Sequence, residues 1–305
     1  MNNIENPLVS VVLITYNSSK YVLETLESVK NQTWNNIELI VSDDGSTDQT
    51  LEICSNWLTN NSSCFNRTQL ISVPENTGIP SNCNRGLRAA KGEWLKTISG
   101  DDILLENCLS DNIEFSRKFP DASFIVSDLN QIDENSDIIT EKAVNEGLIY
   151  FANISSVKNQ LKAYIRWPIF LNVPSFFCKK EIVQNIGYCD ENFWIYEDTT
   201  MVIRLLEKGV KPYYMKKPTV AYRIHLNSIS RNEKMNNKRE IEAYKIFQKY
   251  RLKHLNFFNP FDVSVYYESW LRFKYKGLFG YKGVSILRKF SFYYWFMRLN
   301  GVKTY

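Results

Sequence analysis

The sequence predicts an α/β protein with a doubly wound, mostly parallel sheet, followed by a helical, basic and aromatic C-terminal region. Apolar, β-branched runs alternate with segments of helical periodicity over the first hundred residues. Polar clusters follow the expected strands, as they do in sheets of this class. Charge divides the chain: residues 227–305 hold 16 Lys and Arg against 5 Asp and Glu, whereas residues 1–226 hold 21 against 28.

The first elements follow from periodicity and turn residues. Residues 8–17 (LVSVVLITYN) and 37–46 (IELIVSDDGS) are the first two expected strands. Between them, a helix is expected from the spacing of Tyr21, Val22, Leu26 and Val29. Ser46 and Gln49 predict a capping box for a helix in residues 47–58.

The next elements continue the alternation. Residues 69–73 (QLISV) are a third expected strand, and 92–99 (GEWLKTIS) a fourth. The loop 74–82 (PENTGIPSN) precedes a helix with Cys83, Leu87 and Ala90 on one face. Beyond it come further expected segments: a helix in 106–119, a strand in 122–129, an irregular stretch in about 133–173, a helix in 199–207 and a strand in 213–225.

Composition narrows the class of protein. With 44% hydrophobic and 23% charged residues, the chain is expected to fold throughout. The first residues lack the pattern of a secretory signal, and no apolar run approaches the length of a membrane span, so we expect a cytoplasmic protein. The six cysteines form no CxxC pair and have no nearby histidine, so neither a zinc site nor a disulfide framework is expected.

Three polar clusters stand at expected strand ends: Thr15 to Asn17, Asp43 to Ser46, and Ser99 to Asp102. The carboxyl ends of parallel strands meet at one edge of a sheet, so these clusters are expected to share a crevice. Adjacent carboxylates at Asp101 and Asp102 repel each other unless a positive charge lies nearby. Such a pair is typical both of a capped surface turn and of a Mg²⁺ or Mn²⁺ site, and both interpretations are open at this point.

The motifs resemble those of family 2 glycosyltransferases of the GT-A fold, a Rossmann-like architecture. The resemblance covers about residues 7–230 and rests on segments in the family's order: VSVVLITYN, NQTW, ELIVSDDGSTDQT, ENTGIPSNCNRGLRAAKGEW, SGDD, YEDTTMVIRL and YRIHLNSIS. It implies a catalytic domain in residues 1–226, with a nucleotide-binding half to about residue 102 and an acceptor half in 103–226. Residues 227–305 then form a separate helical region.

The resemblance implies a set of donor-binding residues: Ile14, Thr15, Tyr16, Asn17, Asp43, Asp44, Asn76, Gly78, Asn84, Asp101 and Arg223. In this set Asp44 accepts a hydrogen bond from the nucleotide base, and the main chain near Ile14 and Thr15 flanks the ring. Asp44 is also placed to cap the following helix. Asp101 contacts the ribose. Arg223 faces either a phosphate or the surface.

A divalent metal ion, Mn²⁺ or Mg²⁺, is implied at Asp102, where it bridges the two phosphates of the donor. His225 resembles the late histidine that completes the metal shell. A lone histidine is more often structural than a ligand. However, the chain has only 2 histidines, and this one follows a late strand inside a matching motif.

Catalysis is implied at the pair Glu197 and Asp198. Asp198 matches the general base of inverting members, and Glu197 the neighbour that orients the acceptor. An acceptor hydroxyl must lose its proton as it attacks the anomeric carbon, which a carboxylate within hydrogen-bond reach can accept. Acids here also favour a helix N-terminus electrostatically. The implied reaction moves a sugar from a nucleotide-diphospho-sugar, with UDP expected, to a hydroxyl of a glycan.

Two positions depart from the family pattern. A third acid often precedes the aspartate pair, where this chain has Ser99 and Gly100, so the implied metal set is minimal. An arginine often precedes the asparagine that matches Asn84, where this chain has Cys83. Arg85 follows that asparagine, and the pattern leaves open whether it compensates.

The C-terminal region suggests a membrane partner. Residues 257–305 contain 17 aromatic residues in 49, interleaved with Lys and Arg. Such segments suit a membrane interface with anionic lipid. The rings could equally pack on the catalytic domain. With the cytoplasmic expectation, this suggests peripheral contact with the inner face of the cell membrane. The family resemblance then implies a polyprenyl-diphosphate-linked acceptor in the synthesis of surface polysaccharide or O-antigen.

Two other functions were weighed. A metal-dependent nucleotidyltransferase would be expected to carry a Gly-rich, basic loop near its N-terminus, and residues 13–21 (LITYNSSKY) contain no glycine. A non-catalytic nucleic-acid-binding module would use the basic tail. The acidic body and the lack of an RNA-binding motif argue against it, so no nucleic-acid partner is expected.

Overall fold

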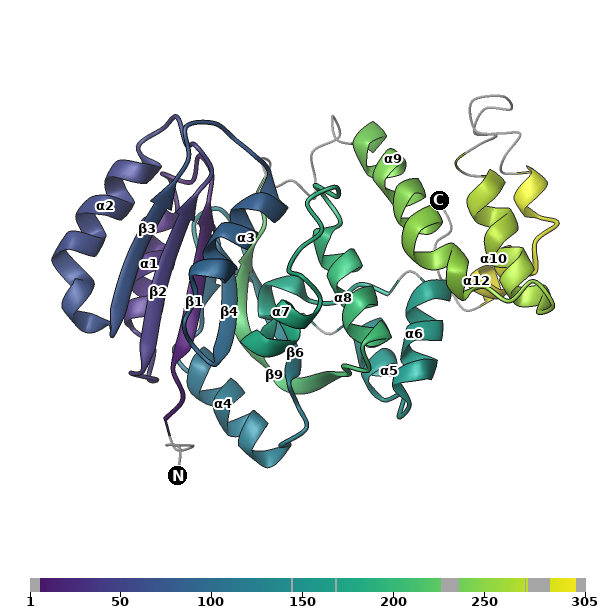
Figure 1. Cartoon of the computed structure of the whole chain (residues 1–305), viewed down its shortest axis with the longest axis horizontal. Helices are drawn as coiled ribbons and strands as arrows, with labels where there is room; N and C mark the ends of the chain where they lie inside the picture. The colour runs from purple at the N-terminus through teal and green to yellow at the C-terminus, as the bar shows by residue number, and fades with distance from the viewer. Residues whose placement is uncertain are drawn as a thin grey trace. The chain divides into compact units, whose positions relative to one another are not determined.

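The computed structural model describes residues 6–143, 145–167, 169–225, 236–271, 273 and 286–299. The chain divides into two compact units, one of Met1–Leu161 with Ile169–Arg231 and one of Lys162–Pro168 with Asn232–Tyr305. The first unit contains the sheet and the helices that cover it, and the second is helical (Figure 1).

The sheet of the first unit has a parallel half and a mixed half. Its order in the described residues is β3-β2-β1-β4-β8-β6-β9-β5, with β7 paired to β6. The parallel half consists of β1 (Val9–Thr15), β2 (Ile37–Asp43), β3 (Arg67–Ser72) and β4 (Trp94–Ser99). The mixed half consists of β5 (Ile103–Leu104), β6 (Phe124–Ile132), β7 (Ile138–Ala143), β8 (Phe177–Lys179) and β9 (Pro212–Arg223).

The strand order reverses between β1 and β4. From β1 the chain moves outward to β2 and β3, then returns to place β4 on the other side of β1. A ligand crevice is expected at such a switch point, outside the carboxyl ends of the strands. The expected doubly wound α/β architecture is therefore confirmed for the first four strands.

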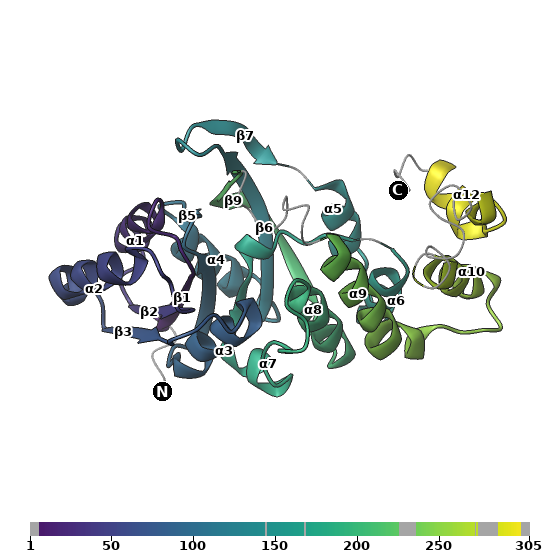
Figure 2. The ribbon, with the colours of Figure 1, turned by 90° about the horizontal axis from the view of Figure 1, so that it is seen from above.

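Helices cover both faces of the parallel half (Figure 2). Apolar residues of α1 (Val22–Lys30), α2 (Thr50–Asn61) and α4 (Cys108–Lys118) form one buried cluster with alternate residues of β1 and β2. On the opposite face, α3 (Ile79–Ala89) packs so closely that a β-carbon at Gly86 would lie 2.3 Å from Cγ1 of Val12. β1 and β2 are buried on both faces, which explains their continuous apolar sequence.

The remainder of the first unit is more ordered than its sequence suggested. The stretch expected to be irregular contains β7, α5 (Glu146–Ala152), α6 (Val157–Arg166) and the short turn η2 (Val173–Ser175). After β8 come α7 (Lys180–Asn185) and α8 (Glu197–Glu207), and α8 begins two residues before its expected start.

The capping box expected at Ser46 and Gln49 is wrong. The helix α2 begins at Thr50, and the Ser46 hydroxyl donates to Asp43 at 2.5 Å instead of capping it. Asp48 takes the capping role, because its Oδ1 accepts from the main-chain N–H of Thr50 at 3.0 Å.

The second unit contains α9 (Asn236–Ile246), the turns η5 (Phe247–Arg251) and η6 (Leu252–His254), α10 (Pro260–Trp270) and α12 (Phe292–Leu299). An aromatic cluster joins Trp167 to α10 and α12, with ring centroids 5.0 Å from Phe261 and 4.8 Å from Phe296. An ion pair of 2.5 Å between Arg166 and Asp262 lies in the same unit. Among the helices described, none has the length and apolar content needed to cross a membrane.

Candidate active site

The strand ends of β1 and β2 are tied together by their polar side chains. Thr15 and Asp43 are register partners, and the Thr15 hydroxyl donates to Asp43 Oδ2 at 2.9 Å. Asn17 adopts a left-handed conformation with φ of 50°, and its Oδ1 accepts from the Thr47 N–H at 2.8 Å. Tyr16 between them is 47% exposed. Thr15, Asn17 and Asp43 thus tie the ends of the two strands to each other and to the start of the loop after β2.

Asp44 is bound by the loop that precedes α3. Its carboxylate accepts from Thr77 N and Oγ1, from Gly78 N at 2.8 Å, and from Arg85 Nη2 at 2.5 Å. The side chain is buried and does not cap α2, which begins at Thr50. Its oxygens therefore fix the loop of residues 73–78, in which Asn76 is exposed.

Arg85 lies beside Asp44 with one donor unused. Nη1 donates to Thr77 Oγ1 at 2.7 Å and Nη2 to Asn82 Oδ1 at 3.1 Å, besides the bond to Asp44. Its Nε is buried and has no hydrogen-bond partner. A buried unpaired donor is costly unless a ligand satisfies it. Whether Arg85 takes the place of the arginine expected at the position of Cys83 stays an open prediction.

The two aspartates after β4 point to different partners. Asp102 is 2% exposed, and its Oδ1 accepts from the main-chain N–H of Arg223 at 2.9 Å. Burial, together with the charge of Asp101, raises the pKa of Asp102 well above its ordinary value. Asp101 Oδ2 instead lies 3.0 Å from His225 Nε2. The positive charges that act on Asp102 are those of Lys96 on β4 and Arg223 on β9.

The expected metal set of Asp102 and His225 stays a prediction. Oδ1 of Asp102 accepts from the main-chain N–H of Arg223, whereas Oδ2 of Asp101 lies beside the imidazole of His225. An oxygen and a nitrogen donor 3.0 Å apart fit a divalent cation whose other ligands are substrate phosphates and water. In the described ranges, which stop at residue 225 and resume at 236, no group of three or more His, Cys, Asp or Glu side chains forms a complete cage.

Arg223 is neither a phosphate ligand nor a surface residue. It is 0% exposed. Its Nε donates to Asp101 O at 2.7 Å, and Nη2 donates to Glu24 at 2.9 Å. Its Nη1 donates to the turn between β6 and β7, at the carbonyl of Asp133 and the hydroxyl of Ser136. All three guanidinium nitrogens donate hydrogen bonds within the protein. The side chain therefore links the turn of Asp101 and Asp102, which we call the aspartate turn, to α1 and to the turn between β6 and β7.

Asp198 stands in the first turn of α8. Its Oδ1 accepts from the main-chain N–H of Thr199 at 2.6 Å, and burial raises its pKa to about 6. A carboxyl with a pKa near neutrality is suited to general base catalysis. Glu197 begins the same helix, and its carbonyl accepts from the Thr200 hydroxyl at 2.8 Å. In Figure 1 α8 begins on the side of the sheet where β1, β2 and β4 end.

Asn84 binds protein rather than the crevice. Its Nδ2 donates to the carbonyl of Cys189 at 3.0 Å, and its Oδ1 accepts from the N–H of Cys189 at 2.9 Å. The same amide donates to Glu191 at 2.7 Å. Being fully buried, Asn84 holds the segment before α8 against α3, so its expected role in donor binding needs correction.

Sequence reasoning missed Glu191 and Trp194 in that segment. Glu191 accepts from Ser81 Oγ at 2.9 Å, and the indole of Trp194 lies against Gly78. Only the spacing to the Glu197–Asp198 pair could have pointed to them, because their contacts lie about a hundred residues earlier in the chain.

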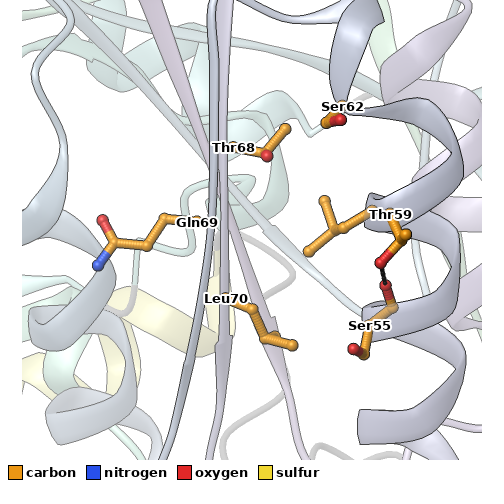
Figure 3. A pocket seen from close by; sticks show the side chains of 7 residues that line it. Ser55, Thr59, Ser62, Thr68, Gln69 and Leu70 are labelled. Carbon is orange, nitrogen blue, oxygen red and sulfur yellow. Dashed lines mark hydrogen bonds between the residues drawn. The ribbon is translucent and has the colours of Figure 1, made fainter.

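A separate surface pocket lies between α2 and β3 (Figure 3). It has a volume of about 280 Å³ and is lined by Ser55, Leu58, Thr59, Ser62, Thr68, Gln69 and Leu70. Its lining carries no ionisable group, and it opens beside the middle of β3 rather than at the carboxyl ends of β1 and β4. We assign it no role in the chemistry.

Comparisons with known proteins found similar sequences and folds. The family model described as Glycosyl transferase family 2 matches residues 10–197. Glycosyltransferase GlyG of Streptococcus pneumoniae serotype 4 is 34% identical over 128 residues, 42% of this chain and 41% of that protein. The match therefore spans about two fifths of that relative's length. An uncharacterized glycosyltransferase of Methanocaldococcus jannaschii is 26% identical over 257 residues, 83% of this chain and 81% of that protein.

Solved structures share the fold at low identity. TarS residues 1–349 of S. aureus, in complex with UDP-GlcNAc, has a TM-score of 0.61 at 18% identity, covering 89% of this chain and 73% of that one. Mannosyltransferase PcManGT of Pyrobaculum calidifontis, in complex with GDP-Man and Mn²⁺, has a TM-score of 0.59 at 16% identity, covering 97% and 79%. The GT-A fold implied by the sequence motifs is thereby confirmed.

Proposed function

The chain belongs to glycosyl transferase family 2, and on that premise we propose that it transfers a sugar from a nucleotide-diphospho-sugar to a hydroxyl of a glycan acceptor with inversion at the anomeric carbon. The observation that carries the proposal is the pairing of Asp101 Oδ2 with His225 Nε2 at 3.0 Å. This pair lies where β4 and β9 end, next to the crevice at which the strand order reverses.

Asp101 and His225 are the proposed metal ligands, in place of Asp102. A divalent cation bound there supplies positive charge that neutralises the departing diphosphate. Asp102 stabilises the turn that carries Asp101, because its carboxylate accepts a hydrogen bond from the main-chain N–H of Arg223. The resemblance implied that Asp101 contacts the ribose, and we propose it as a metal ligand instead.

Asp198 is the proposed general base. Its pKa of about 6 leaves it ionised at neutral pH, so it can accept the proton of the acceptor hydroxyl. In-line attack by that hydroxyl on an α-linked donor gives a β-glycoside without a covalent intermediate. Glu197, adjacent on the same turn, orients the acceptor.

UDP is the proposed nucleotide of the donor. The neighbour TarS is described with UDP-GlcNAc, whereas PcManGT is described with GDP-Man, so both nucleotides belong in the test. In this proposal the base lies near Ile14, Thr15 and Asp44, and Tyr16 and Asn17 line the rim. Arg85 Nε, buried and unpaired, provides a further donor for a base carbonyl.

A panel of UDP- and GDP-sugars with Mn²⁺ or Mg²⁺ tests the proposal. Nucleotide binding by calorimetry and sugar release or transfer are recorded for the protein and for Asp198→Asn, Asp101→Asn and Asp102→Asn. We expect Asp198→Asn to bind nucleotide nearly normally and to lose transfer. Asp101→Asn should lose metal-dependent binding, whereas Asp102→Asn should keep it, because the amide oxygen can still accept from the main-chain N–H of Arg223.

A matched control is Asp111→Asn, a partly buried aspartate of α4 that pairs with Lys217 at 2.7 Å. It should behave as the unmodified protein. Normal turnover by Asp198→Asn would contradict the base assignment, and activity unaffected by a chelator would contradict the metal site.

The second unit is proposed to contact a membrane that carries the acceptor. On α12, Phe292 and Leu299 are 73% and 83% exposed, and Phe290 just before it is 80% exposed. Arg288, Lys289 and Arg298 flank these side chains. Apolar rings among cations suit an interface with anionic lipid. A peripheral position at the inner face of the cell membrane would bring a polyprenyl-diphosphate-linked glycan to the enzyme, as in polysaccharide or O-antigen synthesis.

The family assignment favours a glycosyltransferase over the two alternatives considered from the sequence, a nucleotidyltransferase and a nucleic-acid-binding module. A nucleotidyltransferase or a nucleic-acid-binding module would not require the Asp198 carboxylate at its raised pKa beside the sheet edge. Loss of transfer in Asp198→Asn with nucleotide binding retained would separate the transferase from both.

A further inference from the structure

Two loops of the first unit meet at Gly78. We call residues 73–78, which precede α3, the donor loop, and residues 189–196, which precede α8, the base loop. Gly78 has φ of +97°, a conformation that glycine adopts without strain. A β-carbon built there would lie 2.0 Å from Nε1 and 2.2 Å from Cε2 of Trp194. The indole therefore rests directly on the main chain of Gly78, with no space for any other residue.

Gly78 also touches the proposed nucleotide site. Its N–H donates to Asp44 Oδ2 at 2.8 Å, and Asp44 in turn pairs with Arg85. A shift of the donor loop when a nucleotide binds must therefore move the surface on which Trp194 rests. The indole is rigid and half-buried, so it transmits such a shift rather than absorbing it.

The start of the base loop is anchored. Asn84 holds both main-chain groups of Cys189, and Glu191 accepts from Asn84 and Ser81 of α3. The far end of the loop runs into α8, where Asp198 lies four residues after Trp194. Because the loop runs from this anchor through Trp194 into α8, a displacement of the indole by the donor loop is passed along residues 195–198 to Asp198.

We propose that Trp194 is a positioning residue, which couples occupancy of the donor loop to the placement of Asp198 through its contact with Gly78. The inference rests on the proposed role of Asp198 as base. A displacement of about 1 Å at a catalytic group can cost on the order of a hundredfold in rate. A coupling of this kind delays base catalysis until the donor is bound.

A double-mutant cycle between Gly78→Ala and Trp194→Ala tests the contact. Gly209→Ala is the matched control, because Gly209 has φ of +82° and nothing within 4 Å of its β-carbon position. Gly78→Ala and Gly209→Ala share the strain of a left-handed alanine, but only Gly78→Ala displaces the indole. Transfer of the sugar selected by the nucleotide-sugar panel gives kcat, and calorimetry with UDP or GDP and Mn²⁺ gives nucleotide affinity.

We expect Trp194→Ala to lower kcat by about tenfold or more while nucleotide affinity changes less than about threefold. Gly78→Ala should lower kcat by a similar factor in the unmodified protein, but in the Trp194→Ala background only by the factor that Gly209→Ala costs. If the double variant lowers kcat by the product of the two single factors, the two substitutions act independently and the proposed coupling is wrong. So would a loss of nucleotide affinity as large as the loss of kcat, which would make Trp194 a binding residue.

Hydrogen exchange of the base loop provides a second measurement that needs no turnover. Adding UDP or GDP with Mn²⁺ should slow exchange in residues 192–198 of the unmodified protein and of Gly209→Ala. Exchange should not change in Trp194→Leu, which keeps an apolar side chain should Trp194→Ala fold poorly. Equal protection in Trp194→Leu would overturn the proposal. Normal turnover by Asp198→Asn would instead refute the base assignment and leave a measured Gly78–Trp194 coupling intact.

Discussion

Asp198 retains its proton at a pH where an exposed aspartate has lost it, since burial raises its pKa to about 6. A general base acts only when deprotonated, so kcat should fall as pH drops through about 6, by roughly tenfold per unit below it. A pH profile of kcat between pH 5 and 8 measures this limb. A flat profile over that range would contradict a base with this environment, while unfolding is monitored separately by circular dichroism.

Arg223 is predicted to act on stability rather than on nucleotide affinity. Its three nitrogens join the aspartate turn, α1 and the turn between β6 and β7. Lysine is a point charge and cannot reproduce this fork, so Arg223→Lys should cost about 2–4 kcal/mol in the free energy of unfolding. Urea denaturation measures the loss, and calorimetry with UDP or GDP should show affinity within about threefold. Lost affinity at unchanged stability would restore the phosphate role.

The adjacent aspartates Asp101 and Asp102 show what a sequence motif can and cannot predict. Their pairing and their place after an apolar strand predicted a charged turn at the crevice. The main-chain N–H of Arg223, more than a hundred residues away, binds Asp102 and not Asp101. The motif could not predict this difference, because neighbours in a tight turn point in different directions.

Among the elements, α2 is predicted to depend on Asp48. Hydrogen bonds from Thr50 and Ser19 outweigh the effect of its burial and lower the pKa of Asp48 to about 2. Asp48→Ala should therefore cost about 1 kcal/mol, the usual value of an N-terminal cap. A carboxyl with a lowered pKa stabilises above its unfolded pKa of 3.8 and loses that contribution as pH falls toward 2.

Urea midpoints at pH 7, 5 and 3 measure this dependence. Glu52→Ala is the control, because Glu52 is an exposed acid in the first turn of the same helix. The difference between Asp48→Ala and the unmodified protein should be full at pH 7 and 5 and smaller at pH 3. A difference that does not narrow, or one matched by Glu52→Ala, would contradict the capping role.

The sequence predicted the elements that have a recognisable pattern within their own residues. It did not predict segments whose conformation depends on contacts with residues far away in the chain. The strands β1 and β2 have continuous apolar runs because both faces are buried, and the sequence alone identified them. β7 was missed, because its residues are exposed and carry no alternation. The segment before α8 has no periodic pattern either, since its conformation comes from Asn84 and Gly78 on another element.

At the scale of the whole molecule, charge and apolar exposure divide the chain in the same way. Residues 227–305 carry 16 basic against 5 acidic side chains, and the most exposed aromatic side chain of the described residues, Phe258 at 98%, is among them. The domain boundary near Asn227 remains a prediction, because residues 226–235 lie outside the described ranges. Much of the aromatic tail, including residues 274–285, also lies outside them.

Membrane binding is predicted to depend on Phe290, Phe292 and Leu299. Burying one large apolar side chain contributes about 1.5–3 kcal/mol, so replacing all three by serine should weaken binding by at least about a hundredfold. Co-sedimentation with vesicles of phosphatidylcholine and phosphatidylglycerol measures the affinity. Raising the salt concentration should weaken it further, because the flanking cations are screened.

The matched control replaces Ile138, Ile139 and Tyr150 of the first unit by serine, since these side chains are 58%, 53% and 63% exposed. It removes a comparable apolar area from a unit that is not basic, so vesicle binding should persist. If both triple variants lose binding equally, general hydrophobicity rather than the α12 surface drives the contact. If neither triple variant loses vesicle binding, the α12 surface does not contact the membrane. The lipid-linked acceptor must then reach Asp198 by another route.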